Sequence, residues 1–221
     1  MGISFRLVFV PAMVLLMFLS FDATLNLSFE KSTVKNSFVN KDVIPICCAW
    51  GPELQDGVLT YSILGQSGTG EGDKKIDNAV ESAVNSWNKN LNGIQIVKSP
   101  VSNNADVFIS FINDGKKVAG KTVNSIDSNG FIRKSYITLS KEFFNRPFSS
   151  GQLEQVAEHE FGHVLGLNHA NFNGNLMSAQ VNDGSKTISP CVIEAVNIAN
   201  SWKIQDGGVS LHGPTKSFVT C

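Results

Sequence analysis

Residues 159–169 of this 221-residue chain read HEFGHVLGLNH and contain three of its four histidines. His159 and His163 are four residues apart, about one turn of an α-helix, so their rings project from the same face and can bind one metal ion. A bare His-Glu-x-x-His arises by chance on the order of once in 200 chains of this length. Adding Gly166 and His169 at fixed offsets lowers that rate to about one in 100,000. The stretch therefore indicates a three-histidine metal site.

The residues before His159 predict the helix that carries the first two histidines. Ser149 and Gln152 form a capping box, a common helix start. Apolar residues then follow at helical spacing: Leu153, Val156, Ala157, Phe161 and Val164. Gly166 ends the helix, because a residue without a Cβ atom readily adopts a left-handed turn. His169 can then fold back as the third ligand.

Outside this helix, hydrophobic periodicity predicts a further long helix and five strands. The helix covers residues 73–90, and the strands cover residues 58–64, 94–97, 107–112, 118–123 and 131–139. Residues 107–112 are apolar enough to be buried on both faces, which indicates an interior strand. A C-terminal helix is expected to begin at Ser189-Pro190. This order of elements predicts an α+β fold with helices packed on one sheet.

The composition predicts one globular domain and excludes some partners. Hydrophobic residues make up 42% of the chain, enough for one sizeable core. Lys and Arg number 18 against 19 Asp and Glu, for a formal net charge of -1, and neither sign forms a long run. We therefore expect no nucleic acid as a partner.

The N-terminal residues predict export. Residues 7–19 contain no strongly polar side chain and follow Arg6, which is typical of a secretory signal. As a helix they would rise about 20 Å, short of the roughly 30 Å hydrocarbon core of a bilayer. We assign residues 1–23 to a signal peptide or an uncleaved hydrophobic anchor, residues 24–46 to a spacer and residues 47–221 to the domain. The protein is then secreted or anchored at the cell surface, and only the anchored form contacts a membrane.

The four cysteines are expected to form disulfides, because their number is even and the compartment is oxidising. A bond between the neighbours Cys47 and Cys48 would be strained. We therefore expect each of them to pair with Cys191 or Cys221, and the sequence does not decide which. The alternative is that one thiolate at 47 or 48 caps the metal and keeps an enzyme latent.

Three polar residues between the later strands raise the question of calcium. Asp114, Asp127 and Asn129 are candidates for a calcium loop. No bidentate Glu stands at the expected offset, so simple turn formation is favoured. His212 lies in a Gly- and Pro-flanked tail, where we expect an exposed side chain without a functional role.

Met177 adds a second mark to the histidine motif, and together they resemble the metzincin peptidases. Leu176-Met177 lies eight residues beyond His169, a spacing similar to that of the matrixin branch. The resemblance covers residues 50–205 and implies a twisted mixed sheet with an edge strand for substrate, two long helices and a C-terminal helix. It also implies one catalytic Zn²⁺ held by His159, His163 and His169, with Met177 in a tight turn beneath it.

The resemblance further implies a zinc-dependent endopeptidase. Three neutral imidazoles leave one zinc position open for water, whose pKa falls to about 7 there. Glu160 would be the general base that takes a proton from this water. An extended peptide would lie antiparallel to an edge strand around residues 118–123, with Ala179, Gln180 and Val181 lining the pocket beyond the scissile bond. The expected partner is a peptide or protein substrate, and the protein is expected to be a monomer.

Two alternatives fit the same residues. One is an exported zinc-binding domain without peptidase activity, in which Glu160 only supports a ligand; the other is a zinc hydrolase of a non-peptide amide. The chain also departs from the family pattern. No tyrosine follows Met177, no cysteine-switch motif is present, and His212 alone cannot supply the second zinc of animal matrixins. Ser178-Ala179 replaces the usual aromatic residue and proline after the methionine.

Overall fold

A computed structural model describes most of the chain beyond residue 40. The described residues are 41–65, 71–112, 118–143, 146–180, 187–201, 213–214 and 216–221, and all belong to one compact unit, Val39–Cys221. The apolar run 7–19, Asp114, Val181 and His212 lie outside them. None of the helices within these ranges is long and apolar enough to cross a membrane.

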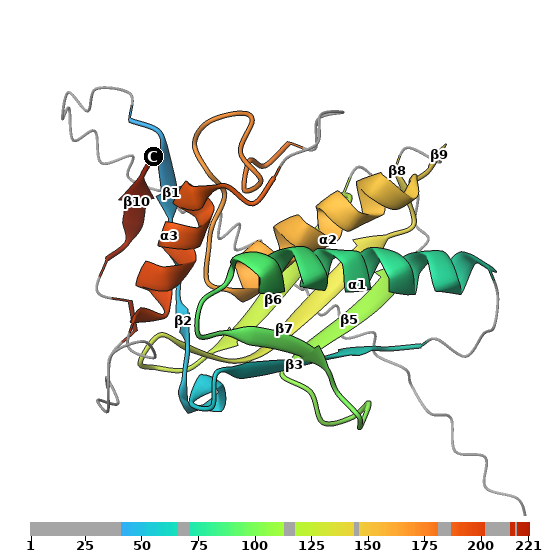
Figure 1. Cartoon of the computed structure of the whole chain (residues 1–221), viewed down its shortest axis with the longest axis horizontal. Helices are drawn as coiled ribbons and strands as arrows, with labels where there is room; N and C mark the ends of the chain where they lie inside the picture. Colours follow the sequence, from blue (N-terminus) through green and yellow to red (C-terminus); the bar gives the residue numbers. More distant parts are fainter. Residues whose placement is uncertain are drawn as a thin grey trace, which may run out of the picture. The chain divides into compact units, whose positions relative to one another are not determined.

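The core of the fold is a twisted sheet of six strands (Figure 1). These are β2 (Ala49–Trp50), β3 (Val58–Ile63), β4 (Gln95–Lys98), β5 (Val107–Ile112), β6 (Gly120–Ile126) and β7 (Phe131–Ser140). β5 lies between β3 and β7 and is parallel to both, as the sequence predicted for an interior strand. β6 is antiparallel to β7, its sole partner among the described strands, and forms an edge. The sheet is therefore mixed, as expected.

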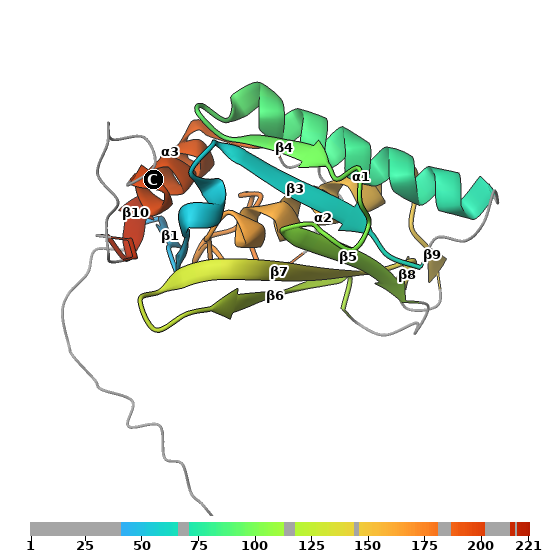
Figure 2. The ribbon, with the colours of Figure 1, turned by 90° about the horizontal axis from the view of Figure 1, so that it is seen from below.

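Two long helices, α1 (Glu71–Asn90) and α2 (Ser150–Val164), cover one face of this sheet (Figure 2). The apolar side chains of α1 at helical spacing are buried, among them Val80, Ala83 and Trp87. The Trp87 indole donates a 2.9 Å hydrogen bond to the carbonyl of Glu158 on α2 and so ties the two helices together. The capping box expected at Ser149 and Gln152 starts α2.

The opposite face of the sheet carries no helix in the described structure, which corrects one expectation. Phe108 on β5 and Tyr136 on β7 stack there with ring centroids 5.7 Å apart, and Tyr136 is 47% exposed. On the inner face of β5 Val107 and Ile109 are fully buried and Phe111 is partly buried, whereas no residue of its outer face is fully buried. The continuous apolar pattern of residues 107–112 reflects aromatic stacking on the outer face rather than a second helical layer.

The two ends of the domain meet beside the sheet. β1 (Val43–Pro45) pairs antiparallel with β10 (Phe218–Thr220), and α3 (Pro190–Ala199) packs near both. α3 starts with the Ser189 cap and Pro190, as the sequence indicated. β1 falls within the stretch 24–46 assigned to a spacer, so its last residues belong to the folded unit. Short elements complete the fold: η1 (Pro52–Leu54), β8 (Glu142–Phe143) and β9 (Arg146–Pro147).

The expected cysteine pairing was wrong. Cys191 is bonded to Cys221, with Cα atoms 5.7 Å apart, and Cys47 is bonded to its neighbour Cys48. The physical reason is the pairing of β1 with β10. It places Cys221 beside α3 and Cys191, and leaves Cys47 and Cys48 with no other sulfur partner in the described structure.

Asp127 forms a turn, as favoured from the sequence. Its carboxylate accepts hydrogen bonds from the backbone N–H groups of Asn129 (2.8 Å) and Phe131 (3.0 Å), and it pairs with the guanidinium of Arg133. These bonds lower the pKa of Asp127, and the hydrogen bond from the N–H of Phe131 has the largest effect. The carboxylate is therefore already engaged in closing the loop between β6 and β7.

Candidate metal centre

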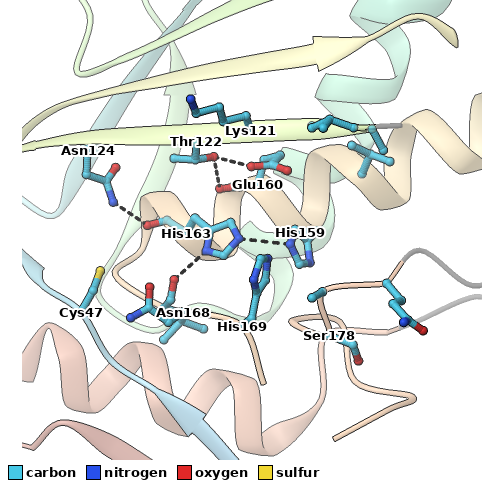
Figure 3. Close-up of a pocket in the computed structure, with 17 residues that line it drawn as sticks. Cys47, Lys121, Thr122, Asn124, His159, Glu160, His163, Asn168, His169 and Ser178 are labelled. Carbon is cyan, nitrogen blue, oxygen red and sulfur yellow. Dashed lines mark hydrogen bonds between the residues drawn. The ribbon is translucent and has the colours of Figure 1, made fainter. Parts of the chain in front are cut away.

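The three histidines of the motif converge on one point (Figure 3). One ring nitrogen from each of His159, His163 and His169 lies within 4.8 Å of the other two. His159 and His163 come from the last two turns of α2, and His169 comes from the loop that follows. The spacing of the motif thus predicted the convergence.

Hydrogen bonds fix which nitrogens face this point. Nδ1 of His159 lies 2.7 Å from the carbonyl oxygen of Leu176, and Nδ1 of His163 lies 2.7 Å from that of Leu167. Because a carbonyl oxygen can only accept, both Nδ1 atoms carry the proton in the neutral rings. Burial lowers the pKa of His163 and of His169, which favours those neutral rings.

The remaining nitrogens form a donor set suited to a cation. Nε2 of His163 lies 3.1 Å from Nε2 of His159. In neutral rings protonated at Nδ1, both Nε2 atoms present lone pairs, and two lone pairs at this distance repel unless a cation lies between them. Imidazole nitrogens are favoured ligands of zinc. The chemistry of this donor set therefore fits a zinc ion.

The turn at Gly166 is required by its surroundings. Gly166 has φ of 96°, in the left-handed region, and a Cβ atom added there would overlap the carbonyl oxygen of Cys48. The backbone N–H of Leu167 donates to the carbonyl of Gly162 at 3.0 Å, which closes the turn. Both the backbone conformation and the close approach of Cys48 favour glycine here.

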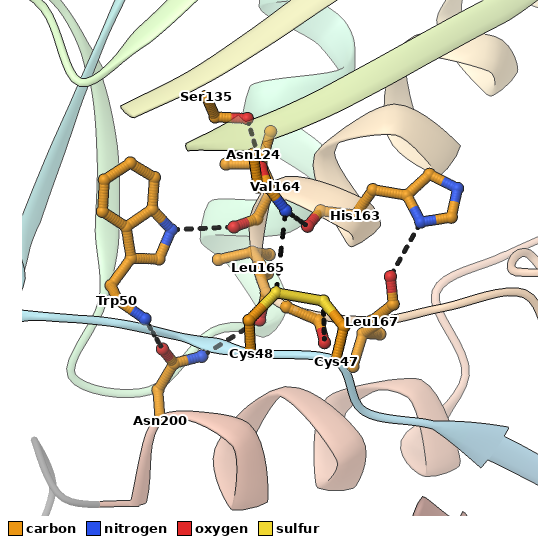
Figure 4. Close-up of a disulfide and its surroundings, with 11 residues drawn as sticks. Cys47, Cys48, Trp50, Asn124, Ser135, His163, Val164, Leu165, Leu167 and Asn200 are labelled. Atoms are coloured by element: carbon orange, nitrogen blue, oxygen red, sulfur yellow. Dashed lines mark hydrogen bonds between the residues drawn. A yellow bond between two sulfur atoms is a disulfide. The ribbon is translucent and has the colours of Figure 1, made fainter. Parts of the chain in front are cut away.

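The 43–48 segment lies against the loop that carries His169 (Figure 4). The N–H of Cys47 donates to the carbonyl of Gly166 at 2.9 Å, and the N–H of Asn168 donates to the carbonyl of Pro45 at 2.8 Å. Ile46 and Leu167 form an antiparallel bridge between these two hydrogen bonds. The third histidine is therefore placed by residues about 120 positions earlier in the chain.

Three side chains from distant elements satisfy the carbonyl groups at the end of α2. Asn124 of β6 donates to the carbonyl of His163 at 3.0 Å, and the Trp50 indole donates to that of Val164 at 2.7 Å. Asn200, which follows α3, donates to the carbonyl of Leu165 at 3.1 Å. Carbonyls in the last turn of a helix have no partner within it, so these bonds fix the end of α2 next to His163.

Met177 lies in a tight turn against the ligand helix, as the resemblance implied. Its side chain is fully buried, and a Cβ atom on Gly162 would overlap its sulfur. The side chain of Asn175 accepts a 2.8 Å hydrogen bond from the N–H of Met177. Since the preceding carbonyl, of Leu176, holds His159, this turn supports the site from below.

Glu160 projects into the cleft beside the histidines, and its carboxylate is bound by Thr122. The Thr122 hydroxyl donates a 2.6 Å hydrogen bond to Oε2 of Glu160. Glu160 is 4% exposed, and burial raises its pKa to about 7 while the bond from Thr122 opposes the rise. Burial thus favours the neutral form of this carboxyl group, and the hydrogen bond from Thr122 favours the carboxylate.

A cleft of about 680 Å³ runs along the metal site. Residues 118–122 of the expected edge strand line one side of it, and Ser178, Ala179 and Gln180 line the other, with the histidines and Glu160 between. Ala179 and Gln180 were expected in the pocket. The cleft also contains Thr122, Asn124 and Cys47. The sequence predicted no individual role for Thr122, which lies in the expected edge strand, or for Asn124, and Cys47 was considered only as an alternative thiolate cap on the metal. Gly120, Thr122 and Asn124 alternate along β6, so the sequence indicates that they share one face of the strand. It does not indicate that this face meets α2.

Comparison with known protein families gives one match. The model of the matrixin family matches residues 49–191, more than half of the chain. A comparison with curated proteins finds no match. The matched residues include the three histidines, Glu160, Met177 and the whole six-stranded sheet.

Proposed function

Because the chain belongs to the matrixin family of zinc metallopeptidases, we propose that it is an exported endopeptidase with Glu160 as its general base. His159, His163 and His169 bind the catalytic zinc. One observation supports this proposal above the others: the converging ring nitrogens share a cleft with a buried carboxylate and an exposed edge strand. The proposed metal site, general base and peptide-binding strand therefore lie next to one another in one cleft.

The residues of the chain divide the chemistry between them. A zinc ion held by the three imidazoles polarises a peptide carbonyl and lowers the pKa of water. Thr122 holds Oε2 of Glu160, which leaves Oε1 to accept a proton from the attacking water and to deliver it to the departing amine. The carbonyls of Leu176 and Leu167 keep the protons of His159 and His163 on Nδ1.

The substrate is proposed to be an extended peptide added antiparallel to β6. An edge strand presents unpaired backbone N–H and C=O groups that a peptide can use. Ala179 and Gln180, which line the cleft, would contact the residue beyond the scissile bond. Export is supported by the apolar run 7–19 and by the disulfides, and we propose that the protein acts as a monomer.

The Glu160→Gln variant tests this function. We expect it to retain one zinc per chain and to lose at least about 100-fold in peptidase activity, since proton transfer loses its carrier. Glu158→Gln is the matched control, because this glutamate is buried on the same helix but does not line the cleft. Cleavage of a mixed peptide library is read by mass spectrometry with and without a chelator.

The outcomes separate the alternatives. Chelator-sensitive cleavage by the wild type, lost in Glu160→Gln and kept in Glu158→Gln, supports the proposal. Full zinc occupancy without any peptide cleavage favours a zinc-binding domain or a hydrolase of another amide. Wild-type activity in zinc-loaded Glu160→Gln contradicts the assigned mechanism.

A further inference from the structure

The inner face of β6 forms a close fit around the side chain of Glu160. Gly120 and Thr122 are two residues apart on an edge strand, so both face α2. A Cβ atom on Gly120 would lie 2.5 Å from Oε1 of Glu160 and 2.9 Å from its Cγ and Cδ atoms. Thr122 Oγ1 lies 2.6 Å from Oε2 and 3.2 Å from the backbone carbonyl of the same residue. Glycine provides the space and threonine provides the donor.

Among the described residues, Thr122 alone donates a hydrogen bond to this carboxylate. At 4% exposure the group has almost no contact with bulk water, and a buried carboxylate without a donor is costly. A glutamate side chain has several accessible rotamers, whereas the χ1 angle of threonine is restricted by its branched Cβ. A rigid donor at this distance selects one orientation of the carboxylate.

We propose that Thr122 is a positioning residue that holds Glu160 in its proton-accepting orientation, with Gly120 providing the space for the carboxylate. The proposal rests on the proposed role of Glu160 as general base. Thr122 also stands on the strand along which the peptide is proposed to bind. The same strand therefore places the scissile bond and orients the base, which keeps the two in register.

The test compares Thr122→Val with Thr122→Ser in the zinc-loaded protein. Valine keeps the shape and suits an edge strand but lacks the hydroxyl, so we expect kcat to fall about 10- to 100-fold, the scale of a hydrogen bond to a charged group. KM should stay within about twofold, because the peptide pairs with the backbone of β6. Serine should restore most of kcat. Thr138→Val is the matched control, since Thr138 lies on β7 and bonds to Ser110 away from the cleft.

Two further measurements do not depend on turnover. Zinc content should remain one per chain in both variants at position 122. The carboxyl ¹³C chemical shift of Glu160 in zinc-free protein should move in Thr122→Val and return toward wild type in Thr122→Ser. Gly120→Ala, which displaces the carboxylate from the other side, should also lower kcat and serves if Thr122→Val folds poorly.

The proposal is overturned if Thr122→Val keeps wild-type kcat, or if Thr122→Ser is as impaired as Thr122→Val. Its failure is distinct from failure of the proposed function. An inactive Glu160→Gln together with a fully active Thr122→Val rejects the positioning role alone. An active Glu160→Gln rejects the general base itself.

Discussion

The proposed zinc ligands fall into two groups that are held in different ways. His159 and His163 stand on α2, whose start is fixed by Ser149 and Gln152 within the same stretch of chain. His169 stands in a loop that is hydrogen-bonded to the 43–48 segment, more than 100 residues away. The first group is a local structure that helix geometry almost guarantees, and the second exists only when the whole domain has folded.

Because of this difference, binding of a metal by all three histidines depends on the pairing of the N-terminal and C-terminal strands of the domain, β1 and β10. The 43–48 segment contacts the loop on one side and pairs with β10 on the other. A complete three-imidazole site therefore requires both ends of the domain to be in place. Zinc binding should in turn stabilise the pairing of β1 with β10, because a ligand that binds the folded state shifts the folding equilibrium toward it.

The largest effect is expected from removing a ligand. His159→Ala, His163→Ala and His169→Ala each leave two imidazoles, so zinc affinity should fall well beyond the about 10- to 100-fold typical of losing a group that only supports a ligand. Zinc content after dialysis and peptidase activity measure this. Equal zinc occupancy in His169→Ala and wild type would show that the loop histidine is not a ligand.

Gly166→Val should displace the loop that carries His169 and leave His159 and His163 on α2 in place. A residue with a Cβ atom at φ of 96° costs about 1 to 3 kcal/mol, and the overlap with the carbonyl of Cys48 adds to it. Zinc content should fall as in His169→Ala while α2 remains helical. Gly174→Val is the matched control, because Gly174 has φ of 79° but open space around its Cα. Normal zinc binding by Gly166→Val would mean that the turn tolerates a side chain.

The sequence was most informative where structure is local. The capping box, the apolar spacing of α2 and the turn at Gly166 follow from rules about neighbouring residues, and so does the interior position of residues 107–112. The edge position of residues 118–123 was implied by the family resemblance instead. The pairing of β1 with β10 follows from no local pattern, since it joins residues about 175 positions apart. The cysteine pairing was wrong for the same reason, because it depends on that strand pair.

The candidate site shows the same limit. Three histidines, Glu160 and Met177 were identified from one motif and its spacing. Thr122 was not, because its contact with Glu160 depends on which face of β6 meets α2. Periodicity predicts that a strand has two faces, and only the three-dimensional packing shows what each face touches.

The two disulfides should differ in their contribution to stability. Cys191 and Cys221 are 30 residues apart, and closing a loop of that length contributes about 3 to 4 kcal/mol in the chain-entropy account. Cys47 and Cys48 are adjacent, so they close almost no loop. Replacing the first pair by serine should lower the Tm by about 10 °C, and replacing the second pair should lower it far less.

Thermal unfolding of the two double variants measures this difference, and non-reducing peptide mapping checks the pairing directly. A mapped bond from Cys47 or Cys48 to either Cys191 or Cys221 would overturn the assignment. Equal losses of Tm would show that the 43–48 segment stabilises the domain through its own disulfide as strongly as the C-terminal bond does.

Two substitutions with small expected effects compare the helix that carries His159 and His163 with the loop that carries His169, because each weakens one of them without removing a histidine. Ser149→Ala removes the cap of α2, and Asn171→Ala removes the side chain that accepts from the N–H of Val43 at 2.8 Å and donates to the carbonyl of Lys41 at 3.2 Å. Each change should cost about 1 kcal/mol and lower the Tm by about 2 to 4 °C.

Zinc affinity should distinguish the two variants, because α2 is held along its length by the core whereas the loop that carries His169 depends on the 43–48 segment. We expect Asn171→Ala to weaken zinc binding several-fold and Ser149→Ala to leave it unchanged, as measured by competition with a chromogenic chelator. The reverse order would place the weak point of the site in the helix rather than in the loop.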